Sequence, residues 1–210
     1  MQEDHRASGR GCTKVKRAEL KTATRSALMD AALALIARQG YEETTVAQIA
    51  REAGVAKGTF FNYFQTKEDV LIQVVKDQLL WVVGQFGALA GTSGSLACGV
   101  REIMVQMVTR LPYTSPLIRA MFRASLSSHE SVSGYVGPSV AMVHALVPVM
   151  AEGQSRGEFR SDLSAERLAF LTAQTYFGVL WAWCMGPGDD SLGALMAQSF
   201  DAFFQGACSK

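Results

Sequence analysis

Apolar side chains recur along most of this chain at spacings of three and four residues, the repeat of a helix that buries one face. Between Leu28 and Ile36 this repeat predicts a helix that ends at Gly40, a residue suited to a left-handed C-terminal turn. The repeat returns from Leu71 to Phe86 and marks one face of a long helix. Segments that alternate apolar and polar residues, as half-buried strands do, are absent. The pattern therefore predicts an all-α protein of about nine helices.

Two short helices are predicted between these long ones, at 46–53 and 57–63, with a tight turn at Gly54 and Val55. Thr44 or Thr45 caps the first of them, and Thr66 caps the long helix that starts near Lys67. The remaining predicted helices are 96–111, 116–127, 138–156, 165–185 and 192–205. The segment from Gly87 to Ser95 is rich in small residues and is predicted as a loop.

Charge divides the 210 residues into two parts, although the whole chain carries a net charge of only +1. Residues 1–76 hold 12 Lys and Arg against 9 Asp and Glu, and the remaining 134 residues hold 8 against 10. We therefore predict a flexible basic tail at 1–21, a charged helical module at 22–68 and an apolar helical body at 69–210. The tail is either a solvated terminus or an arm that touches nucleic-acid phosphates. Its six basic residues are Arg6, Arg10, Lys14, Lys16, Arg17 and Lys21.

The two short helices and their glycine turn form a helix-turn-helix, whose second helix can enter the major groove of DNA. The run from Thr44 to Leu71 reads TTVAQIAREAGVAKGTFFNYFQTKEDVL. It resembles the DNA-binding signature of TetR-family transcriptional regulators, with about a dozen agreements at fixed spacing. The resemblance is strong over residues 24–75, and beyond them it depends on chain length and helical content.

The resemblance implies DNA contacts at eight positions, which are Thr45, Lys57, Gly58, Thr59, Phe61, Asn62, Tyr63 and Lys67. It assigns base reading to the start of the second short helix and phosphate or sugar contacts to the other positions. Two positions depart from the family pattern. Phe61 stands where the family usually has tyrosine and lacks one hydrogen bond to a phosphate. Ala56 stands where serine often caps the helix, a cap that is worth about 1 kcal/mol.

The resemblance also implies a ligand pocket in the body and a homodimer formed by the last two helices. The methionine- and aromatic-rich helices favour an apolar or amphipathic effector. Candidate pocket residues are Met104, Met107, Met121, Phe122, Met142, His144, Tyr176 and Trp183. Candidate dimer residues are Phe177, Leu180, Trp181, Leu195, Met196, Phe200 and Phe203. Either set is also compatible with an ordinary helical core.

Other kinds of chemistry find little support in the sequence. The four cysteines lack metal-ligand spacing, and no signal peptide opens the chain, so we expect reduced thiols, no metal, no cofactor and a cytoplasmic location. No motif for nucleophilic catalysis, phosphate binding or zinc hydrolysis is present, and we expect no enzyme. Residues 168–188 are uncharged and long enough for a membrane span, although polar residues interrupt them.

The sequence therefore predicts a DNA-binding transcriptional regulator, and the family resemblance favours a repressor over an activator. The expected partners are double-stranded operator DNA, a small-molecule effector and a second copy of the chain, with no membrane. The alternative is a helical ligand-binding or membrane-associated adaptor that regulates no DNA.

Overall fold

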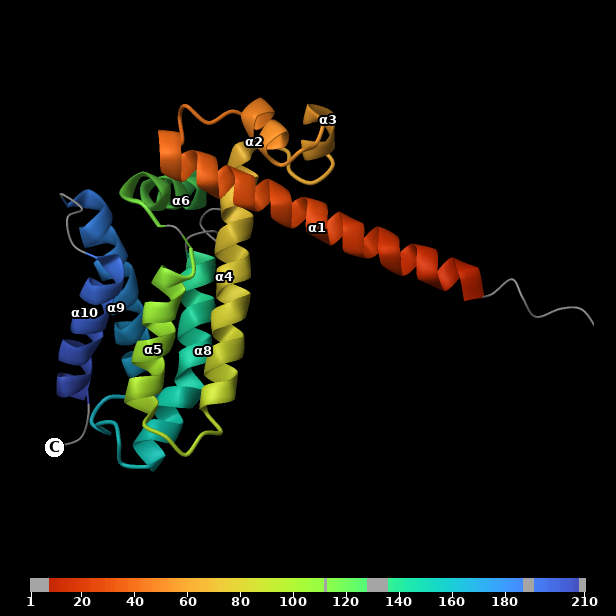
Figure 1. Ribbon diagram of the computed structural model, residues 1–210. Coiled ribbons are helices and arrows are strands. Elements are labelled where there is room, and N and C mark those ends of the chain that lie inside the picture. Colours follow the sequence, from red (N-terminus) through yellow and green to blue (C-terminus); the bar gives the residue numbers. More distant parts are fainter. Residues whose placement is uncertain (1–7, 112, 128–135, 187–190, 208–210) are drawn as a thin grey trace, which may run out of the picture. The chain divides into compact units, whose positions relative to one another are not determined.

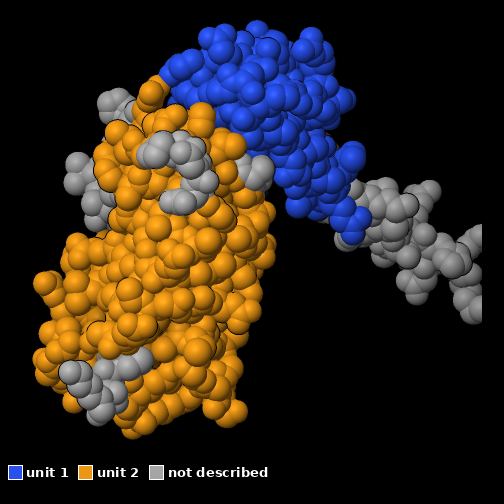
Figure 2. All heavy atoms as spheres, turned by 60° about the vertical axis from the view of Figure 1, so that its left-hand side comes forward, with its two compact units in different colours: residues 1–70 blue, residues 71–210 orange. Residues whose placement is uncertain are grey.

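The fold is known from a computed structural model that describes residues 8–111, 113–127, 136–186 and 191–207 (Figure 1). All nine regular elements in these ranges are α-helices, so the predicted all-α class is confirmed. The chain divides into two compact units, residues 1–70 and residues 71–210 (Figure 2). The division falls two residues beyond the predicted boundary at residue 68, and each unit is described by itself below.

The first helix of unit 1 is longer than predicted. Helix α1 begins at Ser8 and ends at Gln39, so the prediction of a flexible segment up to residue 21 is wrong for residues 8–21. Five of the fourteen residues 8–21 are lysine or arginine, which favour helices, as do Ala18, Glu19 and Leu20, and the two glycines of the segment do not outweigh them. Residues 1–7 of the predicted tail lie outside the described residues.

A small apolar core holds the three helices of unit 1 together. Helices α2, Val46–Glu52, and α3, Lys57–Phe60, follow α1, and α2 packs against both of the others. The buried side chains of this core are Leu28, Ala31, Ala32, Leu35, Ile49, Ala50, Phe60, Phe64 and Val70. Helix α4, Lys67–Leu89, begins in this unit and continues without interruption into unit 2.

Unit 2 is a helical bundle around a larger core. Its further helices are α5, Leu96–Thr109; α6, Ser115–Ser127; α8, Val136–Ser155; α9, Ala165–Met185; and α10, Leu192–Ala207. The predicted bounds of these five helices lie within two residues of the observed ones. Helix α9 packs against α8, α10 and α6, and α10 also packs against α5 (Figure 1). Helix α9 therefore packs against three other helices of unit 2 with one part of its surface.

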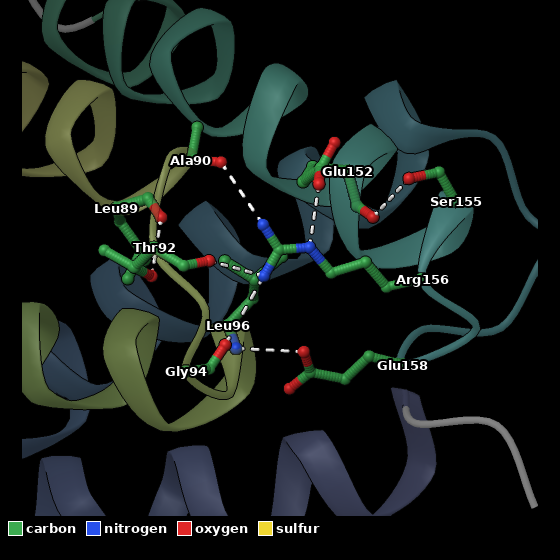
Figure 3. Close-up of polar contacts among 9 residues, drawn as sticks. All are labelled: Leu89, Ala90, Thr92, Gly94, Leu96, Glu152, Ser155, Arg156 and Glu158. Atoms are coloured by element: carbon green, nitrogen blue, oxygen red, sulfur yellow. Dashed lines mark hydrogen bonds and ion pairs between the residues drawn. The ribbon is translucent and has the colours of Figure 1, made fainter.

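A pair of oppositely charged side chains ties the α8–α9 connection to the α4–α5 loop (Figure 3). Arg156 donates to three carbonyl oxygens after α4, those of Ala90 at 3.4 Å, Thr92 at 2.7 Å and Gly94 at 3.5 Å. Glu158 accepts from the first amides of α5, those of Leu96 and Ala97, both at 2.9 Å. Partial burial raises the pKa of Glu158, but these hydrogen bonds and one from Ser95 hold that pKa below its ordinary value.

Helix α9 is the one described helix that is long and apolar enough to cross a membrane, by length and composition alone. Eight of its residues are buried in the core of unit 2, among them Leu168, Thr172 and Tyr176. The hydroxyl of Thr172 donates to the carbonyl of Leu168 at 2.8 Å, so this buried polar group is satisfied within the helix. The core contacts account for the apolar character of these eight residues.

Candidate functional site

A reciprocal set of hydrogen bonds fixes the start of α2. Thr45 is the N-cap: its Oγ1 accepts from the amide of Gln48 at 3.3 Å, and its own amide donates to Gln48 Oε1 at 2.8 Å. The Thr45 hydroxyl also donates to Gln48 Oε1 at 2.9 Å. A phosphate bound by this hydroxyl would therefore compete with Gln48. Thr44, the other candidate cap, is buried and donates to the carbonyl of Gly40 at 2.7 Å.

The turn between α2 and α3 requires a glycine. Gly54 has a φ of 70°, in the left-handed region that other residues rarely adopt. After it, the amide of Val55 donates to the carbonyl of Ala50 at 2.9 Å and closes the turn. Helix α3 then starts at Lys57 without a side-chain cap, because its N-cap is Ala56. The missing serine expected from the family pattern is thus a real loss of one hydrogen bond.

Helix α3 is shorter than predicted, ending at Phe60 and not at Tyr63. The amides of Asn62 and Tyr63 donate to carbonyls three residues back, at 3.1 Å and 2.9 Å. This segment therefore forms tighter turns than an α-helix. Phe60 is fully buried, whereas the neighbouring Phe61 is 51% exposed. The two rings meet edge to face, with centroids 5.5 Å apart.

Seven of the eight predicted DNA-contact residues are accessible and gather around α2, α3 and the turn after α3. Thr45, Lys57, Gly58, Phe61 and Asn62 are exposed, and Thr59 and Tyr63 are half-buried. They combine a basic group, hydroxyls, an amide and an apolar ring. These are the groups that bind phosphates and base edges in the major groove of DNA.

The eighth residue, Lys67, has more protein partners than the resemblance implies. Its ammonium donates to the carbonyls of Tyr41 at 2.8 Å and Thr44 at 3.1 Å, and lies 4.0 Å from the centroid of the Tyr41 ring. The Tyr41 hydroxyl donates to the carboxylate of Glu68. Burial raises the pKa of Glu68, but the bond from Tyr41 leads the contributions that bring it below its ordinary value. Lys67 therefore fixes the loop before α2, and only its third N–H is left for a phosphate.

Sequence reasoning missed Gln48, Tyr41 and Glu68 as parts of this site. Gln48 had a local signal, because Thr45 and Gln48 form the Thr-x-x-Gln pattern of a capping box. Tyr41 is 26 residues from Lys67, and no short motif joins them.

A cavity of about 80 Å³ lies in unit 2. Its lining residues are Val75, Gln78, Leu79, Met107, Tyr113, Ile118, Met121, Phe122, Met142, Tyr176, Phe177 and Leu180. Five predicted pocket residues, Met107, Met121, Phe122, Met142 and Tyr176, are among them.

The other three pocket candidates do not line this cavity. Met104 is fully buried in the core, His144 is exposed and Trp183 is half-buried. Each lies on a helix that contributes other residues to the lining. Gln78 and Tyr113 were missed, because a polar residue inside a helix has no pattern that separates a pocket from solvent.

The predicted dimer residues fall into separate environments. Met196 and Phe200 are fully buried within their own unit, and Leu180 is buried at the cavity. Phe177 also lines the cavity and is half-buried. Leu195 and Phe203 are half-buried. Trp181 is 54% exposed on α9.

Two further apolar residues of α9, Phe170 and Met185, are also exposed. They lie on the same face as Trp181, together with the exposed Gln174 and Gly178. A helical projection of the α9 sequence places these residues on one face.

The part of the chain that the structure describes holds no cluster of three His, Cys, Asp or Glu residues suited to a metal ion. Cys98 is an exposed free thiol, and Cys184 is a buried free thiol. Burial raises the pKa of Cys184, which keeps its thiol protonated and weakly reactive.

Comparisons with known proteins agree with this architecture. The family model described as "Bacterial regulatory proteins, tetR family" matches residues 28–74. The fatty acid metabolism regulator protein of Bacillus subtilis is 46% identical over 59 residues, which are 28% of this chain and 28% of that protein. The HTH-type transcriptional repressor KstR2 of Mycolicibacterium smegmatis is 26% identical over 180 residues, covering 78% of this chain and 81% of the repressor.

A solved structure resembles most of this chain in its fold. The transcriptional regulator FadR from Bacillus subtilis, in complex with stearoyl-CoA, matches with a TM-score of 0.68 and 22% identity. The match covers 86% of this chain and 98% of that one. At this identity the likeness shows the shared fold, a helix-turn-helix unit followed by a helical body.

Proposed function

We propose that this chain is a ligand-responsive, DNA-binding transcriptional repressor of the TetR family, which binds a palindromic operator as a homodimer until an apolar or amphipathic molecule releases it. The observation that carries the proposal is the surface around α3. Phe60 anchors this segment in the core of unit 1, while Lys57, Phe61 and Asn62 remain exposed. A short helix held in this way can enter a major groove without unfolding.

The proposal is tested by selecting DNA from a random duplex library with the full-length chain. We expect a palindrome whose half-sites lie about one helical turn apart, roughly 34–36 Å. The selected duplex should bind about a thousandfold more tightly than a scrambled duplex at the same salt concentration. Equal binding of both duplexes would contradict sequence-specific regulation and leave the adaptor alternative.

Single substitutions should separate base reading from phosphate binding. Lys57→Ala and Thr59→Ala are expected to change base preference, because both residues lie on α3. Lys67→Ala should weaken the binding of all duplexes by the same factor. It should also reduce the slope of log K against log salt concentration by about 0.9, the value of one phosphate contact. Fluorescence anisotropy over a salt series measures both effects.

The control for Lys67 is Lys76→Ala, an exposed lysine on the same helix, which should leave affinity and slope unchanged. A lower affinity of Lys67→Ala with an unchanged slope would refute the phosphate contact. It would leave Lys67 only with its bonds to Tyr41 and Thr44.

The exposed face of α9 supports the homodimer. Phe170, Trp181 and Met185 expose large apolar surfaces along about four turns of this helix, with Gly178 between them. Apolar side chains around a small residue let two helices approach closely, as in four-helix interfaces about a two-fold axis. Aromatic residues such as Trp181 are also common anchors of interfaces.

Gly178→Glu is expected to break the dimer. A Cβ added at Gly178 meets no atom within 4 Å beyond its own helix backbone and chain neighbours, so a side chain has open space there. In the dimer, two like charges would face each other. Sedimentation equilibrium should show association weakened about tenfold or more.

The matched control is Gly84→Glu, since Gly84 is also an exposed helical glycine with open space around it. This variant should remain dimeric. If both variants dimerise as the unchanged chain does, the interface is not on this face of α9.

The remaining assignments follow from this role. We propose a cytoplasmic location, where operator DNA is accessible, and no catalytic activity. The matched relatives are regulators by name, and the described residues contain no metal-ligating cluster.

A further inference from the structure

The cavity of unit 2 combines an apolar wall with a small group of uncharged hydrogen-bonding side chains. Nine of its twelve described lining residues are apolar. The other three are Gln78, Tyr113 and Tyr176, and no charged residue is among the twelve. The wall favours hydrocarbon, and the three polar side chains offer a single place for a polar group.

The polar groups retain hydrogen-bonding capacity. The Gln78 amide donates to the Tyr113 hydroxyl at 3.5 Å, which is long for a hydrogen bond, and leaves the Tyr113 proton free to be donated. Tyr176 is only 3% exposed and makes no hydrogen bond to another described residue. Tyr176 is nevertheless one of the residues that line the cavity, as Gln78 and Tyr113 are.

Both phenols remain neutral donors. Burial raises the pKa of Tyr113 and of Tyr176, and for Tyr176 the neighbouring Tyr113 adds to the rise. Neither hydroxyl ionises at physiological pH, so each presents a proton to an acceptor oxygen.

An anion would be poorly accommodated among these residues. A carboxylate that leaves water without a cationic partner loses several kcal/mol of solvation free energy. Helix α6 carries two arginines, Arg119 and Arg123, and neither lines the cavity. The guanidinium of Arg119 donates to the carbonyl of Cys184. Neutral donors can satisfy a hydroxyl or carbonyl oxygen but do not balance a full negative charge.

We propose that this cavity binds an uncharged, mainly hydrocarbon molecule that carries one hydroxyl or carbonyl oxygen, held by Tyr113, Tyr176 and Gln78. The inference rests on the proposed function, because this molecule would be the effector. The free volume of about 80 Å³ holds a compact ligand. Met107, Met121 and Met142 line it, and their flexible side chains can repack around a longer chain.

Calorimetric titration of the full-length chain without DNA tests the ligand class. The probes are 1-octanol, 2-octanone and octanoate at pH 7, which share a hydrocarbon chain and differ in the polar group. We expect both neutral probes to bind and octanoate to bind at least about tenfold more weakly. Octanoate binding as tightly as 1-octanol would overturn the proposal, and so would the failure of both neutral probes to bind.

Tyr176→Phe tests the polar contact itself. Removal of one hydroxyl should lower the affinity for 1-octanol about three- to tenfold and leave the affinity for the hydrocarbon octane unchanged. Met121→Leu is the control, because a change in the apolar wall should affect octane and 1-octanol by the same factor. Equal losses for both probes in Tyr176→Phe would overturn the polar contact, provided that thermal melting shows the variant to be folded.

The experiment separates this inference from the proposed function. Operator binding is measured independently with the selected palindrome. Palindrome binding without neutral-probe binding would overturn the ligand class alone, whereas neutral-probe binding without palindrome binding would overturn the regulator.

Discussion

Phe60→Ala should unfold the DNA-binding unit at temperatures where the unchanged chain is stable. The ring is fully buried in the core of unit 1, and a Phe→Ala change at such a site costs about 3–5 kcal/mol. The whole unfolding free energy of a domain is about 5–15 kcal/mol, with small domains at the low end. We expect a lower first transition in thermal melting followed by circular dichroism, and loss of operator binding.

Phe61→Ala is the matched control, because it makes the same chemical change one residue later. Phe61 is 51% exposed, so its removal should cost less than about 1 kcal/mol of folding free energy. It should still weaken DNA binding, since Phe61 lies on the surface around α3. A variant of Phe61 as unstable as Phe60→Ala would show that the two rings have been assigned to the wrong sides of the helix.

The contrast between these neighbouring rings shows what the sequence could predict. The helices, their approximate bounds and the buried face of each short helix follow from local periodicity, which is visible in any window of a dozen residues. The turn at Gly54 has a local cause in its positive φ, and the capping box of Thr45 and Gln48 spans only four residues. Features with local causes could therefore be predicted.

The parts that could not be predicted depend on residues far apart in the chain. Lys67 bonds to the carbonyls of Tyr41 and Thr44, and nothing near Lys67 in the sequence indicates those partners. Met196 and Phe200 are apolar in a helix with apolar residues on several faces, so composition did not show that they face the core of unit 2. The start of α1 was missed for another reason, because a basic segment without apolar periodicity can still be helical.

Helix α4 carries residues of both the DNA-binding unit and the cavity. Lys67 at its start holds the loop before α2, and Val75, Gln78 and Leu79 further along the same helix line the cavity. A molecule that displaces Gln78 therefore acts on the same helix that positions α2.

The last prediction is that the ligand and the operator each weaken the binding of the other by the same factor. Two recognition helices cannot both enter successive major grooves if their separation changes by several ångströms. A 100-fold loss of operator affinity requires a coupling free energy of about 2.7 kcal/mol, within the usual allosteric range. Thermodynamic linkage then requires the operator to weaken 1-octanol binding by the same 100-fold.

Calorimetric titration of 1-octanol with and without saturating palindromic DNA measures this factor. Tyr176→Phe provides the control, because it should weaken 1-octanol in both titrations and leave their ratio unchanged. Equal affinity for 1-octanol in the presence and absence of operator, with the cavity occupied in both cases, would show that filling the cavity does not release DNA. In that event α4 joins the two units without coupling them, since a ligand shifts an equilibrium only by its differential affinity for the two states.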